Sequence, residues 1–144
     1  MIVNTLRFSF KDDVGPERQA AVLAAMRRTA TVESVSFSTV GPDLGDPAEG
    51  FTHGYCTGIA DLAALERYMH DPVHLAGDLV IIPALARLHA VRFSDDDDPE
   101  IRSKMFALHR RKLAAYPEWE KLLDSIPDAR VDDRPAPEVP GAGR

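Results

Sequence analysis

The chain has 144 residues, 44% of them hydrophobic, and a formal net charge of −6 at pH 7. This size predicts one compact domain with an ordinary hydrophobic core. The acidic charge is spread along the chain and leaves no basic face, which argues against nucleic acid as a partner. No apolar run approaches the roughly 20 residues that span a bilayer, so we expect no membrane partner either.

A single cysteine, Cys56, excludes an internal disulfide, and the chain does not open with the cationic and apolar segments of a secretion signal. We therefore expect a soluble protein of the reducing cytoplasm. Cys56 is expected to be a small buried hydrophobe, because nothing near it in the sequence favours a reactive thiolate.

The first predicted element is a strand at residues 2–10. Apolar side chains occupy alternate positions of this segment: Ile2, Leu6, Phe8 and Phe10. Asn4 is the polar exception on the same face. A buried amide needs a hydrogen-bond partner or a wet cavity, so Asn4 is a candidate pocket residue, although a hydrogen-bonded core asparagine explains it equally well.

Residues 16–29 are predicted to form a helix, because Pro16 suits a first helical turn and arginines end the segment. A second strand at 32–40, a loop at 41–50 and a third strand at 51–59 follow. In the third strand the larger side chains share one face: Phe51, His53, Tyr55, Thr57 and Ile59.

Asp61 is the expected N-cap of the next helix, which should run through Tyr68 and break at Asp71-Pro72. A further helix is expected from His74 to about residue 86, followed by a last strand at 88–93. This order predicts an α+β, ferredoxin-like domain over residues 1–94, with an antiparallel sheet and helices on one face.

Such a sheet leaves its other face bare. We expect residues 2, 6, 8 and 10 of the first strand, together with 51–59, to line that bare face. A second copy of the chain is then the simplest cover, which predicts a homodimer with the architecture of a dimeric α/β barrel.

A C-terminal helical extension is predicted at residues 95–130. The aspartates before Pro99 are better explained as a helix cap than as an acidic binding motif. Two apolar stripes then indicate two short helices: Ile101, Met105, Leu108, and Trp119, Leu122, Leu123, Ile126. Arg110-Arg111-Lys112 is interpreted as a solvated helix face without a ligand, and residues 131–144 are expected to be disordered.

Tyr68 and His74 are the candidate catalytic residues. They flank the break at Asp71-Pro72, where side chains can turn into a cavity. An imidazole titrates near neutral pH and a phenol near pH 10, so this pair can remove a proton and stabilise the resulting oxyanion. Asp78, at i+4 from His74, would fix the histidine tautomer, although spacing alone favours a capping histidine paired with a surface aspartate.

Further candidates for substrate binding share the inward strand faces: Asn4, Phe8, His53 and Tyr55. A lone inward histidine such as His53 is more often a hydrogen-bonded core residue. His70 and His74 have the spacing of zinc ligands, but Pro72 interrupts the turn and no further ligand completes a set, so we expect no metal and no cofactor. His89 and His109 are interpreted as surface or packing histidines.

Residues 1–94 resemble the Dabb, or stress-responsive A/B barrel, family. The resemblance rests on Phe-Lys-Asp-Asp at 10–13, Glu-Gly-Phe-Thr-His at 49–53 and Tyr-Met-His-Asp-Pro-Val-His at 68–74, which is close to the family's Tyr-x-x-His-Pro-x-His. Asp71 replaces the histidine that usually precedes the proline. The resemblance extends to a plant polyketide cyclase of this family and implies His74 as general base, Tyr68 as oxyanion partner and His53 as a pocket residue, without metal or cofactor. Asn4 stands where that enzyme has histidine.

Three functional hypotheses follow. The first is a cofactor-independent lyase, cyclase or isomerase that acts on a small carbonyl or polyketide-like substrate. The second is a non-catalytic, stress-responsive dimer that binds a small apolar ligand or a protein. The third is a haem or redox role with His74 as the ligand.

Overall fold

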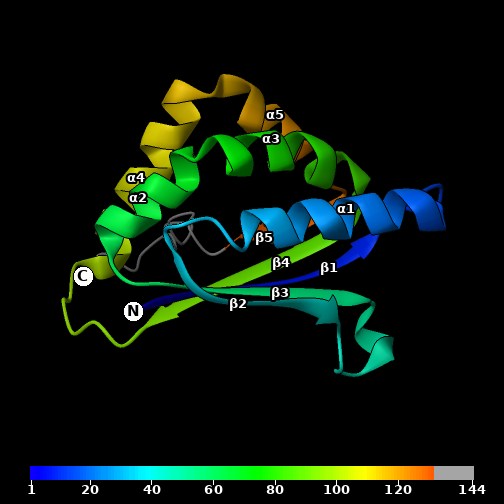
Figure 1. Cartoon of the computed structure of the whole chain (residues 1–144), viewed down its shortest axis with the longest axis horizontal. Helices are drawn as coiled ribbons and strands as arrows, with labels where there is room; N and C mark the ends of the chain where they lie inside the picture. The colour runs from blue at the N-terminus through cyan, green and yellow to red at the C-terminus, as the bar shows by residue number, and fades with distance from the viewer. Residues whose placement is uncertain (132–144) are drawn as a thin grey trace, which may run out of the picture.

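The computed structural model describes residues 1–131. Its centre is a five-stranded sheet in the order β2-β3-β1-β4-β5, with helices α1 to α5 all on one side of it (Figure 1). The strands are β1 (Ile2–Phe10), β2 (Val35–Pro42), β3 (His53–Ile59), β4 (Leu85–Ser94) and β5 (Asp128–Val131). The helices are α1 (Pro16–Thr29), α2 (Leu62–His70), α3 (Pro72–Ile81), α4 (Ile101–Ala115) and α5 (Pro117–Asp124). The predicted α+β, ferredoxin-like fold is confirmed.

The strand register determines which side chains face the helices. β1 pairs antiparallel with both β3 and β4, so that Leu6 lies opposite Tyr55 on one side and Ala90 on the other. Because side chains alternate along a strand, the residues in line with Leu6 point toward the helices. Ile2 and Phe8 are accordingly buried in the core beneath them.

This arrangement corrects the expectation about the bare face of the sheet. The β1 residues expected to line it, and the odd-numbered side chains of β3, are covered by the chain's own helices, because the apolar face of β1 and β3 is the one on which α1 to α3 pack. The open face instead carries the odd-numbered side chains of β1, those of β4 from Arg87 onward, and the even-numbered ones of β3, which belong to the expected range 51–59. Its exposed apolar residues include Phe37 on β2 and Val91 and Phe93 on β4, with 49%, 51% and 60% of their surfaces accessible.

Two aspartates set the path of the chain between β3 and α3. Asp61 caps α2, as predicted, with Oδ1 accepting a hydrogen bond from the Ala64 amide at 2.8 Å. Asp71 ends α2 and caps α3, with Oδ1 accepting from the Val73 amide at 2.8 Å, and Pro72 occupies the first position of α3. α3 therefore begins at Pro72, earlier than predicted, and gives way after Ile81 to a short 3-10 turn.

Gly77 allows α3 to pack closely on α1. A Cβ atom at Gly77 would lie 2.6 Å from Thr29 Oγ1, nearer than side chains tolerate. The glycine therefore fixes how closely α3 approaches the core, and with it the depth of the residues one turn to either side.

The C-terminal extension, residues 95–131, does more than add two helices. After α4 and α5 the chain enters β5, which runs parallel to β4 and makes the sheet mixed. Sequence reasoning missed this strand. The side chain of Ile126 is buried in the core, and an ion pair joins Arg87 Nε to Asp128 Oδ2 at 2.7 Å. The expected disordered tail lies outside the described residues, apart from Val131 at the end of β5.

Among residues 1–131, no helix combines the length and apolar character that crossing a membrane requires.

Candidate active site

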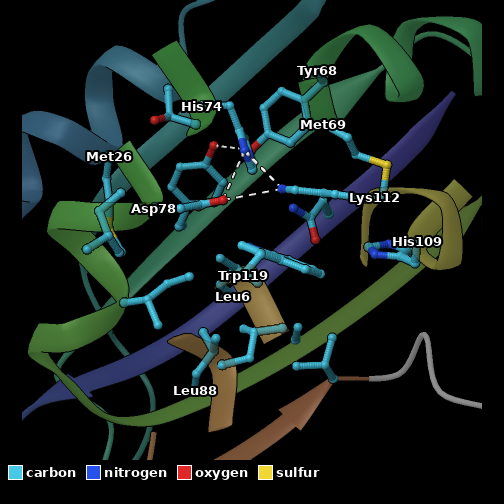
Figure 2. Close-up of a pocket in the computed structure, with 18 of the residues that line it drawn as sticks. Leu6, Met26, Tyr68, Met69, His74, Asp78, Leu88, His109, Lys112 and Trp119 are labelled. Carbon is cyan, nitrogen blue, oxygen red and sulfur yellow. Dashed lines mark hydrogen bonds and ion pairs between the residues drawn. The ribbon is translucent and has the colours of Figure 1, made fainter. Parts of the chain in front are cut away.

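A cavity of about 110 Å³ lies between the helix-covered face of the sheet and helices α2 to α5 (Figure 2). Most of its wall is apolar, including Leu6, Met26, Leu65, Met69, Ile81 and Leu88. The polar groups that reach it come from elements that are far apart in sequence, including β1, β3, β4, α2, α3 and α4. A small, mostly apolar chamber with a few convergent polar groups is the usual form of a ligand site.

His74 and Tyr68 meet at this cavity. His74 is in the first turn of α3 and Tyr68 in the last turn of α2, and the break at Asp71 turns both side chains inward. Their rings contact edge to face, with centroids 4.5 Å apart. The two candidate catalytic residues therefore lie side by side in one cavity (Figure 2).

Asp78 lies behind His74 on the next turn of α3. Its Oδ2 is 3.4 Å from His74 Nδ1, and only 13% and 15% of the two side chains are accessible. When Nδ1 carries the proton and faces the carboxylate, the lone pair of Nε2 is the free basic site of the ring. This is the pairing expected from the i, i+4 spacing, but it is buried instead of lying at the surface.

Burial and neighbouring charges together set the protonation states of His74 and Asp78. It lowers the pKa of His74 below its ordinary value, even though Asp78 opposes the change, so the imidazole is neutral at neutral pH. Burial by itself would raise the pKa of Asp78, but the neighbouring His74 and a nearby ammonium group together outweigh it and the pKa is lowered. The pair is thus a neutral base beside an ionised carboxylate.

The Tyr68 hydroxyl is held by Tyr55 of β3, with the two phenolic oxygens 2.5 Å apart. Burial raises the pKa of Tyr68 to about 12, so it keeps its proton at neutral pH and remains a donor. Burial also raises the pKa of Tyr55 above its ordinary value, and the neighbouring Tyr68 adds to this effect. With Tyr55 donating to Tyr68, the Tyr68 proton is available to an oxygen in the cavity.

The ammonium group near Asp78 belongs to Lys112, and its position corrects the interpretation of Arg110-Arg111-Lys112 as a solvated face. Only 1% of Lys112 is accessible, whereas both arginines are exposed. Its Nζ lies 3.3 Å from Asp78 Oδ2 and 3.4 Å from His74 Nδ1 (Figure 2). The same Nζ lies 4.2 Å from the centroid of the Trp119 ring on α5, a cation–π contact.

A signal for Lys112 was present in the sequence. Lys112 follows Leu108 by four residues and Met105 by seven, so it belongs to the apolar stripe of α4 and not to its outer face. Because Arg110 and Arg111 precede it, Lys112 was interpreted as part of a charged, solvated run. Trp119 and His109 also line the cavity, whereas sequence reasoning treated both as packing residues.

The remaining predicted site residues divide into two groups. Asn4, Tyr55 and Asp78 line the cavity with the candidate pair His74 and Tyr68. Asn4 is 5% accessible, and its Oδ1 has no hydrogen-bond partner among the described residues.

Phe8 and His53 lie outside the lining of the cavity. The His53 ring stacks on Phe8 at 5.6 Å and meets Phe10 edge-on at 5.4 Å, and its Nδ1 is 2.9 Å from Thr52 Oγ1. Their role in substrate binding stays a prediction.

The other candidate ligands and nucleophiles named from the sequence, His70, His89 and Cys56, lie outside the lining of the cavity. Nδ1 of His70 faces the Tyr116 hydroxyl at 3.4 Å instead of joining His74. His89 lies beside Phe51 and Asp128. Cys56 is partly buried on the open face of the sheet, and burial raises the pKa of its thiol. Within residues 1–131, no three His, Cys, Asp or Glu side chains gather as a set of metal ligands.

Solved structures share this fold. A hydroxynitrile lyase from Passiflora edulis is 18% identical, with a TM-score of 0.60, and the match covers 67% of this chain and 94% of that one. A dimeric ferredoxin-like protein from Thermobifida fusca is 26% identical, with a TM-score of 0.58, and covers 65% and 89%. A Dabb family protein from Mesorhizobium loti is 20% identical, with a TM-score of 0.58, and covers 66% and 96%.

No curated protein matches the sequence. The family model of the stress-responsive A/B barrel domain, Dabb, matches residues 2–95, which hold the first four strands and α1 to α3. The chain therefore belongs to the Dabb family of stress-responsive A/B barrel domains.

Proposed function

We propose that this protein is a cofactor-independent enzyme that uses His74 and Tyr68 for acid–base chemistry on a small carbonyl or polyketide-like substrate. The observation that carries the proposal is the meeting of a neutral buried imidazole and a protonated buried phenol at one small, largely apolar cavity. Hydroxynitrile lyase activity in one structural neighbour is consistent with a lyase on this fold, and a cyclase or isomerase would use the same steps.

The proposed reaction begins with proton transfer to His74. Nε2 of the imidazole takes a proton from carbon next to a carbonyl, or from a hydroxyl, while Asp78 accepts a hydrogen bond from Nδ1–H and stabilises the imidazolium. The negative charge that develops on the substrate oxygen receives a hydrogen bond from Tyr68. His74 then returns its proton to the product, so the net reaction is a rearrangement, a ring closure or a cleavage without any redox partner.

The apolar wall contributes to both steps. A wall rich in leucine, isoleucine and methionine lowers the local dielectric constant around the cavity, which strengthens the hydrogen bond from Tyr68. The low pKa of His74 also keeps the base unprotonated at neutral pH. The size of the cavity favours a substrate that is small or that enters it with one end only.

The test is turnover of β-keto and polyketide-like compounds by three variants. His74→Gln should lower kcat by about 10²–10⁴, the usual cost of removing a general base. Tyr68→Phe should lower kcat with little change in KM, because its hydroxyl acts on charge that appears only in the transition state. His70→Gln is the matched control, since it changes a histidine of the same segment outside the cavity. Folded His74→Gln protein with full activity would exclude the proposal.

A non-catalytic role in binding a small ligand is the second candidate. The observation in its favour is that the C-terminal extension covers the cavity, with Trp119, Leu123 and Val131 in the wall, as prolonged retention of a ligand requires. Ligands that raise the melting temperature while no carbonyl compound is turned over would select this function.

A further inference from the structure

The C-terminal extension places a charged side chain beside His74, the proposed base. Lys112 of α4 has its Nζ 3.3 Å from Asp78 Oδ2 and 3.4 Å from His74 Nδ1, so one ammonium group contacts both members of the pair. From this geometry we propose that the C-terminal extension completes the catalytic site and that Lys112 is a positioning residue for His74 and Asp78. This inference rests on the proposed function and concerns the same cavity.

A lysine at this depth requires a specific reason. Burying an ammonium group is costly unless opposite charge and other contacts compensate it, and Lys112 is 99% buried by accessible area. Asp78 supplies the opposite charge and the Trp119 ring supplies a cation–π contact. A helix that only covered the cavity would carry an apolar residue at this position of its stripe, as it does at Leu108.

The family domain alone does not contain this residue. The family match ends at residue 95, and α4, α5 and β5 follow it. The three solved structures described above cover between 65% and 67% of this chain, close to the length of the family domain. Lys112 is therefore an addition from the extension to a group, His74, Asp78, Tyr68 and Tyr55, that comes from the family domain.

Lys112 has two physical effects on the base. It holds the Asp78 carboxylate in place and ionised, which keeps an acceptor available for the Nδ1 proton of His74. It also repels a proton from the imidazole, which opposes charging of His74 before substrate is bound. The titratable and charged groups around His74 come from all the neighbouring elements: Asp71 and Asp78 of α3 and its cap, Tyr68 of α2, Tyr55 of β3, Arg92 of β4, and Lys112 and His109 of α4.

Removing the charge of Lys112 affects the pKa of His74 in two ways, and both act in the same direction. Without the ammonium group, His74 loses a repelling cation. Asp78 stays ionised because His74 itself also lowers its pKa, so the imidazole faces a carboxylate that is no longer shared. Both changes favour the imidazolium form. The apparent pKa of His74 should therefore rise when Lys112 is neutralised.

The experiment is an NMR titration of the histidine ring protons in the full chain without ligand, with His74 assigned from the His74→Gln variant. Lys112→Met removes the charge. Lys112→Gln also removes it but keeps a hydrogen-bond donor near Asp78, and it serves as the second variant should Lys112→Met fail to fold. Lys121→Met, on the exposed side of α5, is the matched control. We expect the titration of His74 to move to higher pH in both Lys112 variants and to stay unchanged in Lys121→Met.

Kinetics supply the second readout. Once a substrate is known, the Lys112 variants should lose about 10- to 100-fold in kcat with KM little changed, and the acidic limb of the rate profile should move to higher pH. An unchanged His74 titration in folded Lys112→Gln would overturn the inference, and a raised KM with unchanged kcat would make Lys112 a substrate contact instead. The proposed function fails separately, if His74 shifts as expected but His74→Gln leaves turnover intact.

Discussion

The hydroxyl of Tyr55 on β3 lies 2.5 Å from the hydroxyl of Tyr68 on α2, so the candidate acid is held by the sheet beneath it. Tyr55 also lies opposite Leu6 in the β1–β3 register, near the centre of the sheet. The phenol with the lower pKa of the two, Tyr68, is the better donor to a substrate, and Tyr55 fixes its orientation. This relationship predicts a supporting role for Tyr55.

Tyr55→Phe should therefore lower the rate without abolishing it. The substitution removes one hydrogen bond, worth about 0.5–1.5 kcal/mol, which corresponds to roughly 2- to 13-fold if the full amount is lost in the transition state. Steady-state kinetics beside Tyr68→Phe and the double variant measure the effect. Because Tyr55 acts only through the Tyr68 hydroxyl, the double variant should resemble Tyr68→Phe. Fully multiplicative losses would show that the two hydroxyls act independently.

The stability of the protein should fall as the pH drops below neutral, in part because of His74. Its pKa is lower in the folded protein than the ordinary 6.5, so between these two values the unfolded chain binds a proton that the folded one does not. Stability therefore rises with pH across this window, by at most about 1.4 kcal/mol per pH unit for one group. Urea unfolding from pH 5 to pH 8 measures the slope.

His74→Gln should flatten that dependence. It will not abolish it, because burial also lowers the pKa of His53, which acts with the same sign. His70→Gln serves as the comparison, since its side chain is partly exposed beside Tyr116. A slope that is the same in His74→Gln and in the unmodified protein would show that His74 is not buried as a neutral base.

The sequence was sufficient for most of the fold and for the centre of the site. Alternation located four strands, Asp61 and Asp71-Pro72 located the helix boundaries, and that break indicated that Tyr68 and His74 could turn into one cavity, although their convergence could not be read from the sequence alone. Alternation could not decide which sheet face the helices cover, because it separates two faces without identifying their neighbours. For this reason the sequence predicts a dimer from the sheet face that the helices in fact cover.

The sequence did not reveal β5 or the pairing of Lys112 with Asp78, for related reasons. β5 is only four residues long, so the alternation of Asp128 and Arg130 with Ala129 and Val131 is too short to predict a strand, and its pairing depends on β4 as a template. Lys112 stands in a run of three basic residues that is ordinarily solvated. Its burial depends on Asp78, which lies 34 residues away in the sequence, and no local pattern reveals such a pairing.

We predict that the protein is a homodimer that pairs through the open sheet face. Phe37, Val91 and Phe93 are exposed there, and a second copy would remove this apolar surface from water. The related protein from Thermobifida fusca is described as dimeric. Light scattering at micromolar concentration should give twice the mass of the chain.

Phe93→Asp should then yield monomers, because pairing would bury its charge without a partner. Leu79→Asp, which places the same charge at an exposed apolar site on α3, should leave the mass unchanged. A monomeric mass for the unmodified protein, or equal effects of the two substitutions, would contradict the proposed interface.

Trp119 should report ligand binding directly. It is the single tryptophan of the chain, it lines the cavity, and its ring contacts Lys112. A ligand that enters the cavity changes the surroundings of the indole, so titration with a small diketone should change the fluorescence intensity and saturate. The Trp119→Phe variant provides the background signal. Binding detected by calorimetry without any change in fluorescence would indicate a site elsewhere.

The Lys112–Asp78 pair should stabilise the protein only as a pair. Lys112→Met or Asp78→Asn alone leaves a buried charge without its partner and should lower the free energy of unfolding by about 3–5 kcal/mol. The double variant should lie closer to the unmodified protein, because neither charge remains. Urea unfolding of the four proteins measures this coupling. The exposed Lys104–Asp98 pair, with Lys104→Met and Asp98→Asn, is the matched comparison and should show far weaker coupling, since solvent screens both charges. Additive losses at Lys112 and Asp78 would mean that the ammonium and the carboxylate do not interact in solution, and the positioning role of Lys112 would fall with them.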